Sequence, residues 1–69
     1  MKYKFTLKQA RNYAGLTVYE LANILNVTPQ TICNWEAGKS NPRTDMIDSF
    51  AKATGVKKED IIFFAQKVN

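Results

Sequence analysis

The strongest constraint on the fold is a set of helix start and stop signals within residues 17–38. Thr17 and Glu20 form a capping box, in which each side chain accepts a hydrogen bond from a backbone N–H at the start of a helix. This helix is expected to end near Leu25, because Asn26 tolerates the left-handed conformation that closes a helix. The signals predict a short helix followed by a sharp turn.

A second helix is predicted directly after this turn. Thr28 is a candidate N-cap, and Pro29 suits the first helical position, where its missing N–H costs nothing. Gly38 provides the stop signal. Two helices over residues 17–37, joined by about three residues, form a helix-turn-helix arrangement.

The two predicted helices differ in what they turn toward solvent. The apolar residues of the first helix fall in one stripe that a core would cover: Val18, Leu21, Ala22 and Leu25. On a helical wheel, the second helix has a mostly apolar side made of Ile32, Trp35 and Glu36. Its opposite side is polar but uncharged and consists of Gln30, Cys33, Asn34 and Ala37, with Thr31 at the boundary.

The rest of the chain carries similar signals. Thr6 and Gln9 form another capping box, which predicts a helix over residues 7–14. A fourth helix is predicted over residues 45–53, from its apolar periodicity. A shorter fifth helix is predicted over residues 58–65, although its start lacks a good cap.

The predicted fold class is all-α, with four or five short helices in one domain over residues 1–69. A short pairing of terminal strands, between residues 2–5 and 63–68, is an alternative for the ends of the chain. A chain of 69 residues supports only a modest core.

Residue counts exclude several classes of protein. The chain has one cysteine, Cys33, and no histidine. These counts remove zinc sites built on Cys/His clusters and Ser-His-Asp or Cys-His catalysis. We therefore expect no enzymatic activity, no metal and no cofactor. No apolar run approaches the roughly 18–20 residues of a membrane span, so a cytoplasmic protein that does not enter membranes is expected.

The net charge of +4 is unevenly distributed along the chain. Residues 1–43 carry six basic and two acidic residues, whereas residues 44–69 carry four of each. The excess positive charge therefore lies in the half that contains the predicted helix-turn-helix. A polyanionic partner such as DNA is favoured by this placement.

The outer side of the second helix has the chemistry of a major-groove reader. A Gln or Asn amide can bond an adenine edge in bidentate fashion, and a Thr methyl can contact the thymine methyl. Gln30, Thr31 and Asn34 are thus candidate base contacts. The alternative is that they are ordinary polar residues on a solvated helix.

Residues 21–39 resemble the lambda-repressor-like family of repressor and Cro proteins, also called XRE-type regulators. The resemblance rests on Leu-Ala in the first helix, Val-Thr after the turn, then Ile, Trp-Glu and Gly-Lys at fixed spacing, with Asn-Pro following. It extends over about residues 7–62. The family implies a compact five-helix fold whose third helix enters the major groove of double-stranded DNA. It also implies a homodimer on a palindromic operator.

The resemblance assigns expected roles to individual positions. The DNA backbone contacts would be Thr17, Thr28, Pro29, Lys39 and Asn41, and Gln30, Thr31 and Asn34 would contact bases. Arg11 and Glu36 match a structural pair that joins the first and third helices of the domain. Because Glu36 lies on the inward side of the wheel, its carboxylate needs such a partner.

The sequence departs from the family pattern in several places. Val18 stands where the family often has a glutamine that reaches phosphate and base, and Asn34 where a basic residue is frequent. Asn26 replaces a common glycine in the turn. Thr44 and Thr54 occupy positions that are usually apolar, which predicts a thinner core around the fourth helix. The changes at Val18 and Asn34 predict weaker binding to DNA phosphates than is usual in the family.

The leading functional hypothesis is a sequence-specific transcriptional regulator, in particular a phage-like repressor that occludes its operator as a homodimer. An apolar C-terminal surface made of Ile61, Phe63, Phe64 and Val68 could form the dimer interface, with plain core packing as the alternative. The second hypothesis is a protein-interaction module, such as an antitoxin or adaptor, that keeps this fold.

Overall fold

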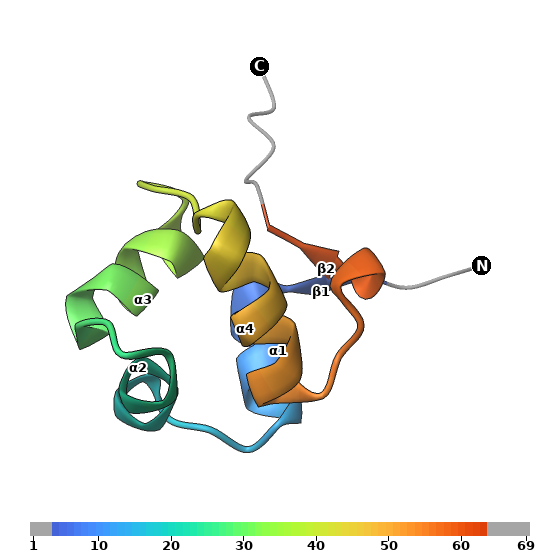
Figure 1. Cartoon of the computed structure of the whole chain (residues 1–69), viewed down its shortest axis with the longest axis horizontal. Helices are drawn as coiled ribbons and strands as arrows, with labels where there is room; N and C mark the ends of the chain where they lie inside the picture. The colour runs from blue at the N-terminus through green and yellow to red at the C-terminus, as the bar shows by residue number, and fades with distance from the viewer. Residues whose placement is uncertain (1–3, 64–69) are drawn as a thin grey trace.

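The computed structural model describes residues 4–63 of the chain, most of which are helical (Figure 1). The elements follow in the order β1 (Phe5–Thr6), α1 (Leu7–Tyr13), α2 (Val18–Leu25), α3 (Pro29–Ala37), α4 (Thr44–Thr54), the 3-10 turn η1 (Lys58–Asp60) and β2 (Ile61–Ile62). The predicted all-α fold class is confirmed. Within residues 4–63, no helix has the length and apolar character needed to cross a membrane.

Threonine caps set the start of the first three helices. The hydroxyls of Thr6, Thr17 and Thr28 each accept a hydrogen bond from the backbone N–H three residues later. Both predicted capping boxes are complete, because Gln9 and Glu20 accept the N–H of their own caps at 2.9 and 2.8 Å. Each cap joins residues only three positions apart, so the helix starts could be predicted from the sequence.

The core lies between the α2–α3 pair and a support made of α1, α4 and the strands. Its buried apolar residues are Leu7, Ala10, Leu21, Ala22, Leu25, Ile32, Trp35, Phe50, Val56, Ile61 and Phe63. The rings of Phe50 and Phe63 meet edge to face with centroids 5.7 Å apart, which joins α4 to the end of β2. Figure 1 shows α4 and α1 side by side between the α2–α3 pair and the two strands.

Thr54 belongs to this core rather than thinning it. Its side chain is buried, and its hydroxyl donates to the carbonyl of Phe50 at 3.0 Å. The N–H of Val56 in turn donates to the same hydroxyl at 3.3 Å. The polar group is therefore satisfied within the last turn of α4, and burying it carries little penalty. Thr44, the other departure, is exposed at the start of α4.

The prediction of a fifth helix over residues 58–65 is wrong for the part that the structure describes. Residues 58–60 make a single 3-10 turn, and β2 follows at once. Ile61 and Phe63 are buried whereas Ile62 is exposed, which is the period-two alternation of a strand. Ile61 and Ile62 are β-branched, which favours a strand. Lys57, at the position before the turn, makes no side-chain hydrogen bond that would cap a helix.

A pairing of terminal strands, the alternative interpretation, is present. Strands β1 and β2 run parallel, with Phe5 opposite Ile61 and Thr6 opposite Ile62. The predicted segments were residues 2–5 and 63–68; of their described residues only Phe5 lies in a strand, and β2 precedes the second segment. The pairing holds the two ends of the described chain against α1.

Candidate nucleic-acid interface

The turn between α2 and α3 is closed by backbone hydrogen bonds. Asn26 adopts the left-handed conformation, with φ 59°, as its place after Leu25 predicted. The N–H of Val27 reaches back to the carbonyl of Ala22 at 2.9 Å, and that of Asn26 to Asn23 at 3.3 Å. The bond from Val27 to Ala22 is the six-to-one hydrogen bond of a Schellman motif, which closes a helix. It fixes the direction in which α3 leaves α2.

The inward side of α3 is packed as the helical wheel predicted. Ile32 and Trp35 are buried in the core. Glu36 is half-buried beside them, and its carboxylate is paired. The helix is therefore held along its length by apolar packing and at its C-terminal end by a charge.

Arg11 and Glu36 form the expected pair between α1 and α3. The Arg11 Nε atom donates to Glu36 Oε2 at 2.7 Å, and Nη2 lies 3.4 Å from Oε1. The Nη1 atom donates to the carbonyl of Leu16 at 2.9 Å, in the α1–α2 connection. Only 11% and 12% of the two side chains are exposed. One guanidinium thus ties α1, the connection and α3 together.

The outward side of α3 presents amides and small groups. Gln30, Cys33 and Ala37 are exposed, and Asn34 is half-buried. The structure brings the two predicted amide readers together: Gln30 Nε2 donates to Asn34 Oδ1 at 3.0 Å. No lysine, arginine, aspartate or glutamate lies on this side of the helix.

Thr31 sits apart from the amide pair. Its hydroxyl lies 2.8 Å from that of Thr28, and its own N–H donates to Thr28 Oγ1 at 3.2 Å. The two threonines and Pro29 make up the N-terminal end of α3. The dipole of this helix end favours a phosphate nearby.

At the N-terminal end of α2, where the resemblance implied a phosphate contact by Thr17, a hydroxyl and a carboxylate lie together. The Thr17 hydroxyl accepts from the N–H of Glu20 at 3.0 Å, which leaves the hydroxyl proton free to donate. The carboxylate of Glu20, however, occupies the same helix end. Beside it, Val18 packs partly against the core. A phosphate at this end therefore meets one hydroxyl donor and a negative charge.

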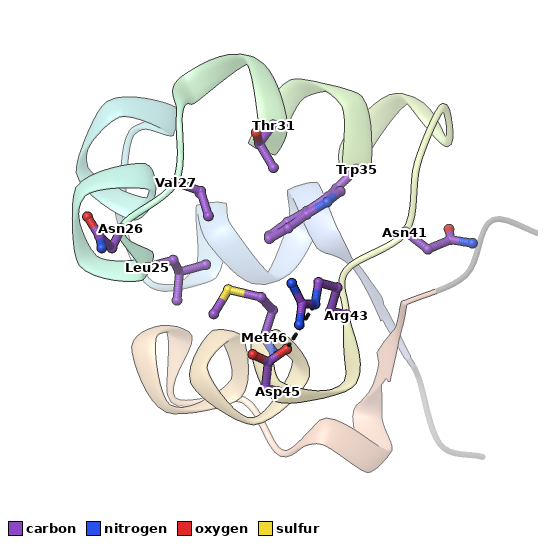
Figure 2. Close-up of a pocket in the computed structure, with 9 residues that line it drawn as sticks. All are labelled: Leu25, Asn26, Val27, Thr31, Trp35, Asn41, Arg43, Asp45 and Met46. Carbon is purple, nitrogen blue, oxygen red and sulfur yellow. Dashed lines mark hydrogen bonds and ion pairs between the residues drawn. The ribbon is translucent and has the colours of Figure 1, made fainter.

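A hollow of about 540 Å³ separates the end of α2, α3 and the start of α4 (Figure 2). Its apolar side chains are Leu25, Val27, Trp35 and Met46, and its polar ones are Asn26, Thr31, Asn41, Arg43 and Asp45. Figure 2 shows Asn41 at its edge, on the loop that follows α3, and the side chain of Arg43 between Trp35 and Asp45.

Arg43 is a candidate contact that sequence reasoning missed. Its side chain is 86% exposed, and its Nε lies 3.7 Å from Asp45 Oδ1, a loose ion pair. Lys39 and Asn41, the predicted backbone contacts of this loop, are also exposed. The sequence could have indicated Arg43, because it is the last positively charged residue in the basic half of the chain, residues 1–43.

The structure does not bring together the apolar C-terminal surface. Ile61 and Phe63 lie in the core with 5% and 8% of their surface exposed. Core packing, the alternative for these two residues, is what the structure shows. Phe64 and Val68 lie outside the described residues. Within one copy of the chain, these two side chains therefore offer little apolar surface to a second copy.

Comparison with known proteins agrees with this geometry. A model of the helix-turn-helix family matches residues 7–61. The chain is 41% identical over 61 residues to a Methanocaldococcus jannaschii protein named as an uncharacterized HTH-type transcriptional regulator, covering 88% of this chain and 92% of that protein.

Two eukaryotic relatives are longer proteins. The chain is 37% identical over 54 residues to Multiprotein-bridging factor 1a of Arabidopsis thaliana, covering 78% of this chain but 38% of that protein. It is 33% identical over 51 residues to human Endothelial differentiation-related factor 1, covering 74% of this chain and 34% of that protein. The chain thus spans little more than a third of these relatives. The match over residues 7–61 nevertheless includes every helix described above, and the chain belongs to the helix-turn-helix family.

Proposed function

We propose that this domain binds double-stranded DNA sequence-specifically, by placing the outward side of α3 in the major groove, and that it regulates transcription. The observation that carries the proposal is the amide pair Gln30–Asn34, displayed on a helix whose other side is anchored by Trp35 and Glu36. A rigid helix with uncharged donors and acceptors suits base edges. The name of the archaeal relative supports the same function.

The base contacts in this proposal are Gln30, Thr31 and Asn34. The backbone contacts are Thr17, Thr28, Pro29, Lys39 and Asn41, to which the structure adds Arg43 as a candidate. Lys39 and Arg43 are exposed cations on the loop after α3, so a phosphate can approach both. A regulator of this kind works in the cytoplasm, where its operator is accessible.

We further propose that two copies bind a palindromic operator and repress transcription by occluding it. A single copy has few cations near α3, so its electrostatic contribution to binding is small. Two copies with their α3 helices about 34 Å apart would read successive major grooves on one side of the duplex. Ile61 and Phe63 are buried within one copy, so we expect other residues to form most of such an interface.

The base-reading role is tested by comparing Gln30→Ala with Lys39→Ala. Gln30→Ala is expected to cost about 1–3 kcal/mol on the cognate site and almost nothing on random DNA, because it removes a base contact. Lys39→Ala should weaken binding to both duplexes alike and reduce the salt slope by about one unit. Fluorescence anisotropy at several salt concentrations measures both effects. Equal losses on cognate and random DNA for both variants would contradict the assignment.

The dimer is tested by footprinting on a site selected from randomised duplexes. We expect two protected half-sites whose centres lie about one helical turn apart, roughly 10 base pairs. Inserting about five base pairs between them should abolish tight binding, because the second helix then faces the wrong side of the duplex. A single protected half-site, unaffected by the insertion, would show that one copy binds alone.

A second candidate function is that of an adaptor or antitoxin that uses the same fold to bind protein. The exposed apolar residues Tyr19 and Ile24 on α2, with 75% and 54% of their surface accessible, favour it. So does the name of the Arabidopsis relatives, multiprotein-bridging factor. An absence of salt-dependent DNA binding at low ionic strength, with a stable protein partner, would favour this function over the first.

A further inference from the structure

We propose that Asn34 is a positioning residue: it fixes the amide of Gln30 in one orientation, so that Gln30 selects adenine over guanine. This inference rests on the proposed function and narrows it. Asn34 was expected to read a base through its own amide. The direction of its hydrogen bond to Gln30 assigns it another task.

The contact joins residues one turn apart on the same side of α3. Gln30 Nε2 donates and Asn34 Oδ1 accepts, at 3.0 Å. Residues at this spacing are neighbours on a helix surface, so the contact needs no rearrangement of the backbone. The helix itself is held by Ile32 and Trp35 in the core and by the Arg11–Glu36 pair.

The direction of this bond determines what Gln30 has left to offer. A glutamine amide has two N–H donors and one carbonyl acceptor. Asn34 takes one donor, so one N–H and Oε1 remain for a base. Adenine presents one acceptor, N7, and one donor, N6, in the major groove. The remaining groups of Gln30 match this pair.

Guanine is a poor partner for the same amide. It presents two acceptors, N7 and O6, in the major groove. A free glutamine could turn both N–H groups toward them, but Gln30 has committed one to Asn34. Guanine would therefore receive one hydrogen bond and place its second acceptor against Oε1.

Asn34 offers a different pattern from the one predicted for it. Its Oδ1 faces Gln30, so its Nδ2 group is left to donate. Such a donor suits an acceptor on the neighbouring base or a phosphate oxygen. Asn34 also holds a long side chain in place before DNA arrives, which reduces the entropy lost on binding.

The experiment measures adenine-over-guanine preference for five versions of the full chain: wild type, Asn34→Ala, Asn34→Asp, Gln30→Ala and the double variant Gln30→Ala/Asn34→Ala. The cognate site is first selected by the wild type from randomised duplexes. The position read by Gln30 is then identified as the one at which Gln30→Ala loses its base preference. Dissociation constants are measured on two duplexes that carry adenine or guanine there.

We expect the wild type to prefer adenine by roughly five- to 150-fold, the range of a good bidentate contact. Asn34→Ala should lower the ratio, because Gln30 is no longer held and can turn its second donor toward guanine. Asn34→Asp keeps an acceptor for Gln30 and should keep the wild-type ratio, although its negative charge weakens binding to both duplexes. In the Gln30→Ala background, Asn34→Ala should leave the ratio unchanged.

Two results would overturn the inference alone: a wild-type ratio in Asn34→Ala, or an equal loss of the ratio in Asn34→Ala and Asn34→Asp. A wild type that selects no sequence would overturn the proposed function, and this inference with it. Circular dichroism melting of the variants separates a change in readout from a loss of folding. Both asparagine variants alter a surface position and should melt close to the wild type.

Discussion

Replacing Glu36 with alanine is expected to lower the free energy of unfolding by about 3–5 kcal/mol. The substitution leaves the guanidinium of Arg11, whose side chain is only 11% exposed, without its carboxylate. An unpaired charge at such a site is far more costly than the loss of one contact. In a domain of this size, a loss of 3 kcal/mol lowers the melting temperature by roughly 12–24 °C. Urea and thermal unfolding followed by circular dichroism measure the change.

Asp48→Ala is the matched control for this prediction. Asp48 also pairs with a cation, Lys58, at 3.3 Å, but 62% and 54% of their side chains are exposed. Exposed pairs contribute about 0–1 kcal/mol, so the control should unfold close to the wild type. Glu36→Gln should fall between the two, because its amide oxygen can still accept from Arg11. Similar losses of unfolding free energy in Glu36→Ala and Asp48→Ala would show that burial does not determine how much the Arg11–Glu36 pair contributes to stability.

Phe50→Ala should be about as damaging, through packing rather than charge. We expect a loss of about 3–5 kcal/mol, the usual cost of removing a buried aromatic ring. Phe50 is 1% exposed, and its ring contacts that of Phe63. Removing it opens a cavity between α4 and β2. Denaturant unfolding at several temperatures would give the change in stability.

Ile24→Ala is the control for Phe50, because its apolar side chain lies on α2 with 54% of its surface exposed. Its stability should stay within about 0.5 kcal/mol of the wild type. Where Phe50→Ala remains folded, its affinity for the selected DNA should also be unchanged, since Phe50 lies in the core and not on the outward side of α3. A parallel loss of affinity would mean that α4 positions the recognition surface directly.

Features that depend on neighbours in sequence could be predicted. The caps at Thr6, Thr17 and Thr28 are hydrogen bonds across three residues, so the residue types alone indicate them. The left-handed Asn26 follows for the same reason. The inward side of α3 was predictable because helical periodicity places Ile32 and Trp35 together.

Features that depend on distant partners could not be predicted in the same way. A short apolar run such as Ile61–Phe63 is compatible with helix or strand, and the parallel partner that decides it lies at Phe5–Thr6. The spacing of Gln30 and Asn34 predicted that they are neighbours on the helix. It did not predict which of the two amides donates the hydrogen bond. The position of Arg43 beside the hollow depends on where the loop after α3 meets α4.

The parallel strand pair has a consequence for how this domain can be built into larger proteins. It brings residues 5–6 beside residues 61–62, at the side of the domain opposite α3 (Figure 1). A polypeptide that enters and leaves a domain at one edge can carry it as an inserted module, without threading past its working surface. In the bridging-factor relatives, the matched segment makes up 38% of the protein. Additional segments joined at this edge would leave the outward side of α3 uncovered.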